Sequence, residues 1–163
     1  MLAEVVRSPV VQVAEPRSIH RVLLAFDGSP GSWAALHQAI AVADAQHALL
    51  TIAGVVGEPT VWLGFGPIVM PYTREALVRE LERDMQRKLA AARDEVPATV
   101  SVTTQLLHGR PARALAGLAA SGNYDLVVAG PRKAGFLRRL FGGSVTHSLL
   151  TRSNTSVLAV KDS

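Results

Sequence analysis

Residues 130–147 carry the residue types that could bind an anion. The segment follows an apolar, strand-like run over residues 124–129 and precedes a helix-like run. A small residue such as Gly130 lets the backbone approach a phosphate closely. Gly143 and Ser144 at a helix start would present free N–H groups, a hydroxyl and the positive end of the helix dipole. These residue types and their order predict a phosphate-binding loop.

The net charge of the chain is concentrated in the same segment, which holds four basic residues and no acidic one: Arg132, Lys133, Arg138 and Arg139. The whole chain has 17 Lys and Arg against 13 Asp and Glu. Removing these four leaves 13 basic residues, so the four account for the formal net charge of +4. A local excess of this kind suits a small anion at least as well as a nucleic acid, and only 5% of the residues are aromatic and able to stack on bases.

Other chemistries find little support. The absence of cysteine excludes disulfides, thiolate metal sites and a cysteine nucleophile. The five histidines show no close ligand spacing, which disfavours a zinc site. Ser144 and His147 lie one helical turn apart, but without an acidic partner they do not predict a covalent nucleophile.

The length and composition predict one folded domain. A chain of 163 residues with 48% apolar content can bury a single core. In residues 1–17, Glu4 and Arg7 interrupt the region where a signal peptide would need an apolar run, and we expect an extended or disordered arm there. Residues 18–163 would form the domain. No uncharged apolar run reaches 18 residues, so we expect no membrane partner and a cytoplasmic protein.

The sequence alternates between strand-like and helix-like patterns, and these elements would position the phosphate-binding loop. Apolar or alternating runs predict five strands, at residues 21–26, 48–56, 99–107, 124–129 and 156–160. Helical patterns predict helices at residues 30–47, at 74–96, in an alanine-rich stretch from 111 to a cap at Gly122, and at 144–152. Five strands joined by helical crossovers predict an α/β fold, a doubly wound parallel sheet with helices on both faces.

Two loops of such a sheet would meet at one edge. Ligands in these folds bind outside the carboxyl ends of the strands, where the strand order reverses. The loops after the first and fourth strands, at Asp27 and at residues 130–143, would lie there. Asp27 has an alternative role, which is to open a turn and support a helix cap at Ser29. Residues 57–73 are predicted to be a long loop that packs over the second helix or forms a lid or a partner surface.

The chain resembles the universal stress protein family over residues 19–161. The resemblance rests on five segments in a fixed order: Val22 to Ser29, Gly109 to Ala112, Asp125 to Gly130, Gly143 to Val145 and Ser156 to Val160. It implies a single domain like that of the adenine-nucleotide alpha hydrolases, with sheet order 3-2-1-4-5. It also implies a homodimer, which agrees with the apolar fifth strand expected at the C-terminal edge of the sheet.

The ATP-binding members of that family carry Gly, two residues, Gly, nine residues, then Gly-Ser or Gly-Thr. Gly130 and the Gly143-Ser144 pair match this spacing, but Lys133 stands where the second glycine belongs. Gly135 matches a further glycine that often follows. Lys133 either obstructs the pocket or adds a favourable charge beside the phosphates, and the two readings stay open.

By analogy with the nucleotide-binding members, Asp27 would lie near the ribose, preceded by Ala25 and Phe26, and the backbone of Val55 near the adenine. The phosphates would lie among Gly130, Arg132, Lys133, Gly135, Gly143, Ser144 and Val145. The implied ligand is ATP, with or without Mg²⁺. Each residue could instead have a purely structural role: Val55 could be a core valine, Ser144 could be a helix cap, and the arginines could form a solvated face.

Two functional classes follow from the sequence. The first is a universal stress protein that regulates by binding ATP or a related adenine nucleotide. At most slow hydrolysis is expected, because no general base beyond Asp27 is evident. The second is a nucleotide-free dimeric interaction or scaffold protein of the same fold. Nucleic-acid binding rests on the basic loop alone and is not favoured.

Overall fold

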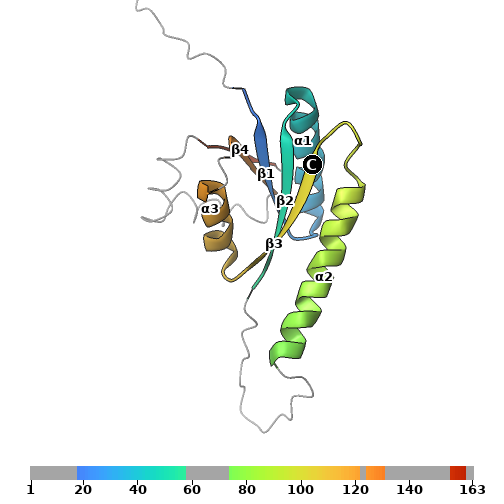
Figure 1. The fold of residues 1–163 in the computed structure, drawn as a ribbon, viewed down its shortest axis with the longest axis vertical. Coiled ribbons are helices and arrows are strands. Elements are labelled where there is room, and N and C mark those ends of the chain that lie inside the picture. The colour runs from blue at the N-terminus through green and yellow to red at the C-terminus, as the bar shows by residue number, and fades with distance from the viewer. Residues whose placement is uncertain (1–17, 58–73, 122–123, 131–154, 161–163) are drawn as a thin grey trace, which may run out of the picture.

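Five parallel strands form one sheet in the order β3-β2-β1-β4-β5 (Figure 1). The computed structural model describes residues 18–57, 74–121, 124–130 and 155–160. The strands are β1 (Arg21–Phe26), β2 (Leu49–Val56), β3 (Val102–His108), β4 (Leu126–Ala129) and β5 (Ser156–Ala159). The parallel pairing and the order 3-2-1-4-5 confirm the predicted sheet.

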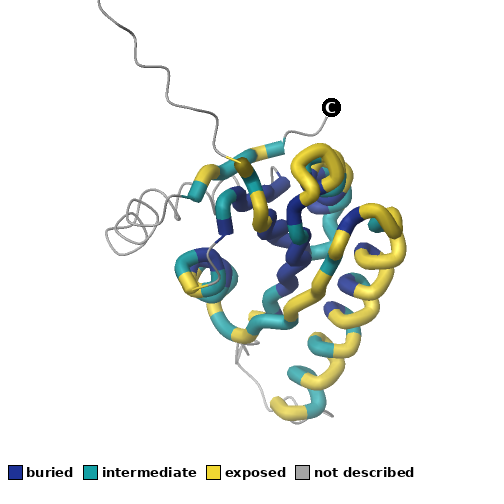
Figure 2. The backbone as a smooth tube through the Cα atoms, turned by 45° about the horizontal axis from the view of Figure 1, so that its top comes forward, coloured by how far each residue is buried: buried dark blue, intermediate teal, exposed yellow. Residues whose placement is uncertain are grey.

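Helices cover both faces of this sheet. α1 (Pro30–Gln46) and α2 (Arg74–Asp94) pack on one face, and α3 (Pro111–Ser121) packs on the other. Right-handed crossovers explain this arrangement, because the chain adds β2 and β3 in one direction from β1 and then reverses to add β4 and β5. In Figure 2 β1, β2 and β4 run through the buried centre, whereas the edge strands and the outer sides of the helices are largely exposed or half-buried.

The central strands are buried on both sides. In β1 only Arg21 is exposed, and all four residues of β4 are buried. Leu24 belongs to the cluster under α1 and α2, whereas its neighbour Leu23 belongs to the cluster under α3. Alternate side chains of a strand point to opposite faces, so a strand covered on both faces must be apolar throughout.

α1 begins and ends close to the predicted positions. The Ser29 hydroxyl accepts the N–H of Ser32 at 3.3 Å, and Pro30 occupies the first turn, where no backbone N–H is needed. His47 ends the helix in the left-handed conformation, with a φ of 52°.

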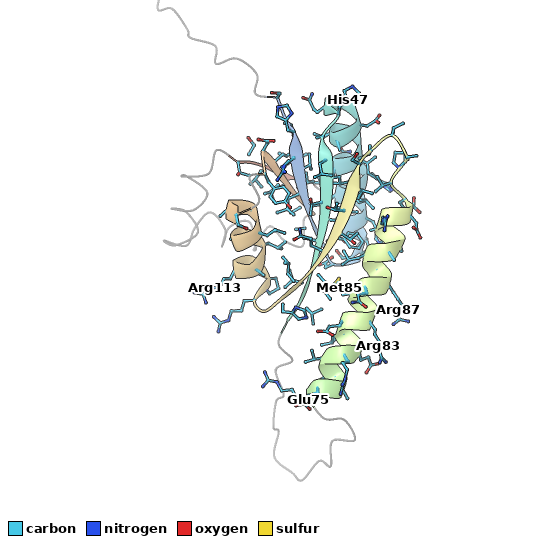
Figure 3. The ribbon with its side chains drawn as sticks, in the orientation of Figure 1. His47, Glu75, Arg83, Met85, Arg87 and Arg113 are labelled. Carbon is cyan, nitrogen blue, oxygen red and sulfur yellow. The ribbon has the colours of Figure 1, made fainter. Side chains whose placement is uncertain are left out.

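The apolar face of α2 is buried over only half of the helix. Its buried residues are Met85, Leu89 and Ala92. Met85 points toward the strands (Figure 3), where a Cβ on Gly54 of β2 would lie 2.6 Å from the Met85 sulfur. Leu77 is half-buried and Leu81 is 38% exposed, so the first half of the apolar face is only partly covered. The first turns of α2 extend past the ends of the strands (Figure 1), beyond the described part of the sheet.

Three strands begin later than predicted, β2 by a single residue, at Leu49. β3 begins at Val102 rather than at residue 99, because residues 97–100 form a turn in which the N–H of Val100 bonds to the carbonyl of Pro97 at 3.0 Å. β4 begins at Leu126 rather than at residue 124. The residue before it, Asp125, has a separate role at the amino ends of the strands.

Asp125 connects the amino ends of β1 and β4 through its side chain. Its Oδ2 accepts the backbone N–H of His20 at 2.8 Å and that of Arg21 at 2.9 Å. These residues lie more than a hundred positions apart in the sequence, so a single carboxylate fixes the start of β1 against a strand formed much later in the chain.

Four predicted features lie wholly or almost wholly outside the described residues: the arm over residues 1–17, the loop over residues 57–73 apart from Gly57, the cap at Gly122, and the helix over residues 144–152. Among the helices of the described ranges, none is long and apolar enough to cross a membrane.

Candidate functional site

The carboxyl ends of β1 and β4 meet where the strand order reverses. Ala25 pairs with Ala129, so Asp27 and Gly130 follow closely on two neighbouring strands. In parallel sheets of this kind a ligand usually binds at such a reversal, because the loops leave toward opposite faces. The structure therefore brings together the starts of the two loops that the sequence predicts to meet.

Gly130 lies directly against the first turn of α1. A Cβ on Gly130 would collide with the backbone carbonyl of Gly31 and would lie 3.0 Å from the backbone nitrogen of Ser32. Backbone atoms at a helix start cannot move aside as a side chain can, so this position requires glycine. The close approach between β4 and α1 is a structural need that is independent of any ligand.

Asp27 opens the turn between β1 and α1. Its Oδ1 accepts the N–H of Ser29 at 3.0 Å, and Gly28 between them has a φ of +79°. The role of Asp27 in the turn and in the Ser29 cap is thus confirmed. The residue is half-buried, and its position after the central strand also brings a carboxylate to the edge where a ligand hydroxyl could approach.

Ala25 and Phe26 are buried in the central strand, backbone and side chain alike. They are 1% and 2% exposed, and the Phe26 ring packs edge-on against Trp33 with ring centroids 5.1 Å apart. Val55 is half-buried and packs against the cluster under α3, which also contains Ala25. Of these three residues, only Val55 therefore has surface that a ligand at this edge could contact.

Six predicted site residues lie outside the described ranges: Arg132, Lys133, Gly135, Gly143, Ser144 and Val145. The anion-binding loop remains a prediction from the sequence. The described residues hold the strand ends from which that loop departs.

Lys88 of α2 is a basic residue near this edge that sequence reasoning missed. Its side chain lies against Gly28, and its Nζ is 2.7 Å from Oδ2 of Asp84. The hydrogen bond from Lys88, together with the charges of Lys88 and Arg87, lowers the pKa of Asp84. The helical spacing could have placed Lys88 on the side that packs on the sheet, because it follows Met85 by three positions.

A second contact fixes α2 to the outer strand. Nε2 of His108, the last residue of β3, lies 2.7 Å from Oε1 of Glu82. The next residue, Gly109, has a φ of +104° and donates its N–H to the carbonyl of Val56. Side chains from α2 thus reach the carboxyl edge at both β1 and β3.

No group of three His, Cys, Asp or Glu side chains within the described ranges is arranged to hold a metal ion. Surface hollows lined by described residues run along α2 and between α2 and β3.

Known relatives match this chain over almost its entire length. The profile of the universal stress protein family matches residues 18–161. A Thermus aquaticus protein, named a universal stress protein in the QAH/OAS sulfhydrylase 3′ region, is 35% identical over 141 residues. The match covers 86% of this chain and 97% of that protein.

Solved structures of the same family share the fold. A universal stress family protein from Burkholderia pseudomallei superposes with a TM-score of 0.63 at 24% identity, covering 89% of this chain and 98% of that one. A universal stress protein solved in complex with cAMP superposes with a TM-score of 0.61 at 26% identity, covering 90% of this chain and all of the other.

Proposed function

Because the chain belongs to the universal stress protein family, we propose that it is a small cytoplasmic regulator of the stress response that binds ATP or a related adenine nucleotide. The observation that carries the proposal is the position of Asp27 and Gly130 after neighbouring strands at the reversal of strand order. The 26% identical relative with cAMP bound supports an adenine nucleotide as the ligand class.

The strand ends would hold the nucleoside part of the ligand. Asp27 would accept a hydrogen bond from a ribose hydroxyl, since its carboxylate stands at the end of the central strand. Val55, which is half-buried, would border the adenine, and the buried Ala25 and Phe26 would support the ribose site from beneath.

The loop after β4 would hold the phosphates. Gly130, Gly135, Gly143, Ser144 and Val145 would supply backbone N–H groups and a hydroxyl. Arg132 and Lys133 would supply positive charge, and a Mg²⁺ ion could accompany a triphosphate. We favour Lys133 as a side chain that swings outward and modestly assists the phosphates, because so much positive charge has no evident use at an empty site.

The proposed activity is binding rather than rapid turnover. Asp27 already accepts the N–H of Ser29 in the turn, and no other candidate base stands at the end of β1 among the described residues. Occupancy by the nucleotide, and its effect on the loop after β4 and on the dimer surface, would be the regulatory signal. Hydrolysis would be slow.

The first test asks what the purified protein binds. Calorimetric titration with ATP, ADP, AMP and cAMP should give saturable binding of at least one of them. Mass spectrometry of small molecules released on denaturation should find the same nucleotide if the protein retains it during purification. Binding of none of the four by protein shown to be ligand-free would overturn the proposal.

The second test locates the phosphates. Gly143→Asp should abolish nucleotide binding, because it adds a carboxylate where the helix N-terminus would receive a phosphate. Gly117→Asp is the matched control: it makes the same change in α3, at an exposed position with no atoms near a new Cβ, and should leave affinity unchanged. Equal affinity in both variants would show that the phosphates bind elsewhere.

A nucleotide-free interaction protein is the second candidate, and Lys133 in place of the motif glycine is the observation that favours it. Lys133→Gly separates the two. If the lysine assists the phosphates, the change should weaken ATP binding by about 1 to 3 kcal/mol, the usual value of a charge-assisted contact. Tighter binding by the variant at both low and high salt would favour the scaffold.

A further inference from the structure

The Lys88 side chain lies across the turn that carries Asp27. Gly28 has a φ of +79°, and a Cβ built on it would lie 2.8 Å from Cδ of Lys88, 3.1 Å from Cε and 3.3 Å from Cγ. Three consecutive methylene carbons of the lysine therefore pass directly over Gly28. This contact joins α2 to the turn between β1 and α1.

The ammonium group of Lys88 is carried toward the ligand edge of the sheet. α2 begins beside the carboxyl ends of the strands and runs back along the sheet (Figure 1). Helical side chains lean toward the N-terminus of their own helix, so Lys88 points toward the carboxyl edge. Its Nζ reaches Asp84, one helical turn nearer that edge.

The pair that holds this ammonium can open. The Lys88 and Asp84 side chains are 41% and 46% exposed, and exposed pairs of this kind contribute little stability. Asp84 also lies 3.4 Å from the guanidinium of Arg87, so it keeps a cationic partner if Lys88 moves away. The methylene carbons of Lys88 thus pack on Gly28, while its ammonium pairs with the Asp84 carboxylate, which has Arg87 as a second partner.

We propose that Lys88 is a further nucleotide-binding residue, whose ammonium transfers from Asp84 to a phosphate of the bound nucleotide while its methylene carbons stay against Gly28. The inference rests on the proposed function, because it assumes a ribose beside Asp27. A phosphate attached to that ribose would come within the range of a four-carbon side chain anchored at the next residue.

Calorimetric titration with ATP and with adenosine tests the inference, because only ATP carries phosphates. Lys88→Met keeps the carbons that cover Gly28 and removes the charge. It should weaken ATP binding about tenfold, as expected for one charge-assisted contact, and leave adenosine binding unchanged. Arg83→Met is the matched control. It removes the same charge from an exposed side chain of the same helix, and the ion pairs of Asp84 are with Arg87 and Lys88, so it should change neither affinity.

Asp84→Asn should change the ATP affinity in the opposite direction. It releases the ammonium from its carboxylate, so ATP should bind a few-fold more tightly while adenosine binds as before. A merely structural role for Lys88 would weaken both ligands equally. An unchanged ratio of ATP to adenosine affinity in Lys88→Met, or weaker ATP binding by Asp84→Asn, would overturn the inference alone. Failure of the wild-type protein to bind any adenine nucleotide would overturn the proposed function as well.

Discussion

Two glycines at the ligand edge are required by packing, each for a different reason. Gly130 allows the backbone of β4 to approach that of α1, and Gly28 has a positive φ beneath the Lys88 side chain. A substitution at either residue would disturb the fold and any ligand together. Tests of nucleotide binding therefore belong at Gly143, Lys133 and Lys88, where a loss of affinity can be separated from a loss of stability.

Gly130→Ala should destabilise the protein by about 1 to 3 kcal/mol or more, because the added methyl group meets backbone atoms that cannot repack. Gly117→Ala is the control, since the same methyl group meets nothing within 4 Å in a helix. It should stabilise the protein by about 0.5 to 1 kcal/mol. Urea unfolding of both variants measures the two changes. The close contact at Gly130 would be refuted if both variants gained stability.

Asp125→Ala should cost about 1 kcal/mol, because it removes the carboxylate acceptor of two backbone N–H groups, those of His20 and Arg21, which are exposed and can bond to water instead. Asp125→Asn retains one acceptor oxygen and should cost less. Thermal unfolding of the two variants shows which one loses more stability. Hydrogen exchange should also locate faster opening at the start of β1 in the alanine variant. Equal stability of Asp125→Ala and wild type would contradict this role.

α2 shows that an apolar stripe identifies the inner side of a helix but not how much of it is covered. Leu81 and Leu89 lie about two turns apart, on the same apolar side of the helix. Leu89 is 4% exposed and Leu81 is 38% exposed, because the strands end before the helix does (Figure 1). The difference in exposure depends on where the neighbouring strands end, which the spacing of apolar residues in α2 does not reveal.

Leu89→Ala and Leu81→Ala should therefore differ widely in stability, although they are the same substitution in one helix. The first leaves a cavity against the sheet and should cost about 2 to 5 kcal/mol. The second removes a partly solvated side chain and should cost less than about 1 kcal/mol. Denaturant unfolding compares them directly. Similar losses would mean that Leu81 is covered in solution.

The order of elements followed from the sequence because each central strand, buried on two faces, is a short continuous apolar run. The exact strand boundaries could not be predicted from the sequence, because the turn at Pro97 and the side-chain contacts of Asp125 depend on residues that meet only in the fold. At the candidate site the positions of Asp27 and Gly130 were predictable from topology. The contact of Lys88 with Gly28 was not, because it joins two elements about sixty residues apart.

At the scale of the whole molecule, β5 presents an edge that suits a second copy. Ser156 and Val160 donate their N–H groups to carbonyls of Asp125 and Ala129, at 2.8 and 2.9 Å. Backbone groups alternate along a strand, so the N–H of Ala159 points to the outer edge. Among the described residues no strand pairs with that edge. We propose that the homodimer forms there.

Ala159→Pro should convert the proposed homodimer into a folded monomer. Proline removes the outward N–H and leaves the inward hydrogen bonds to β4 in place, which an edge strand tolerates. Ala159→Val keeps the N–H and should remain dimeric. Light scattering at micromolar concentration and circular dichroism distinguish loss of pairing from unfolding. A wild-type monomer that persists on concentrating, or a dimeric proline variant, would refute this interface.

The division of the core between two faces has a consequence for synthesis on the ribosome. A nascent chain that has emerged as far as His108 holds β1, β2, β3 and the two helices of one face. Its opposite face, with Leu23 and Ala53, still lacks α3, and β1 still lacks its neighbour β4. Until the last third of the protein has emerged as well, this half-built sheet would expose both an apolar surface and an open strand edge. That interval is when a chaperone would be needed, and stress that slows translation would lengthen it.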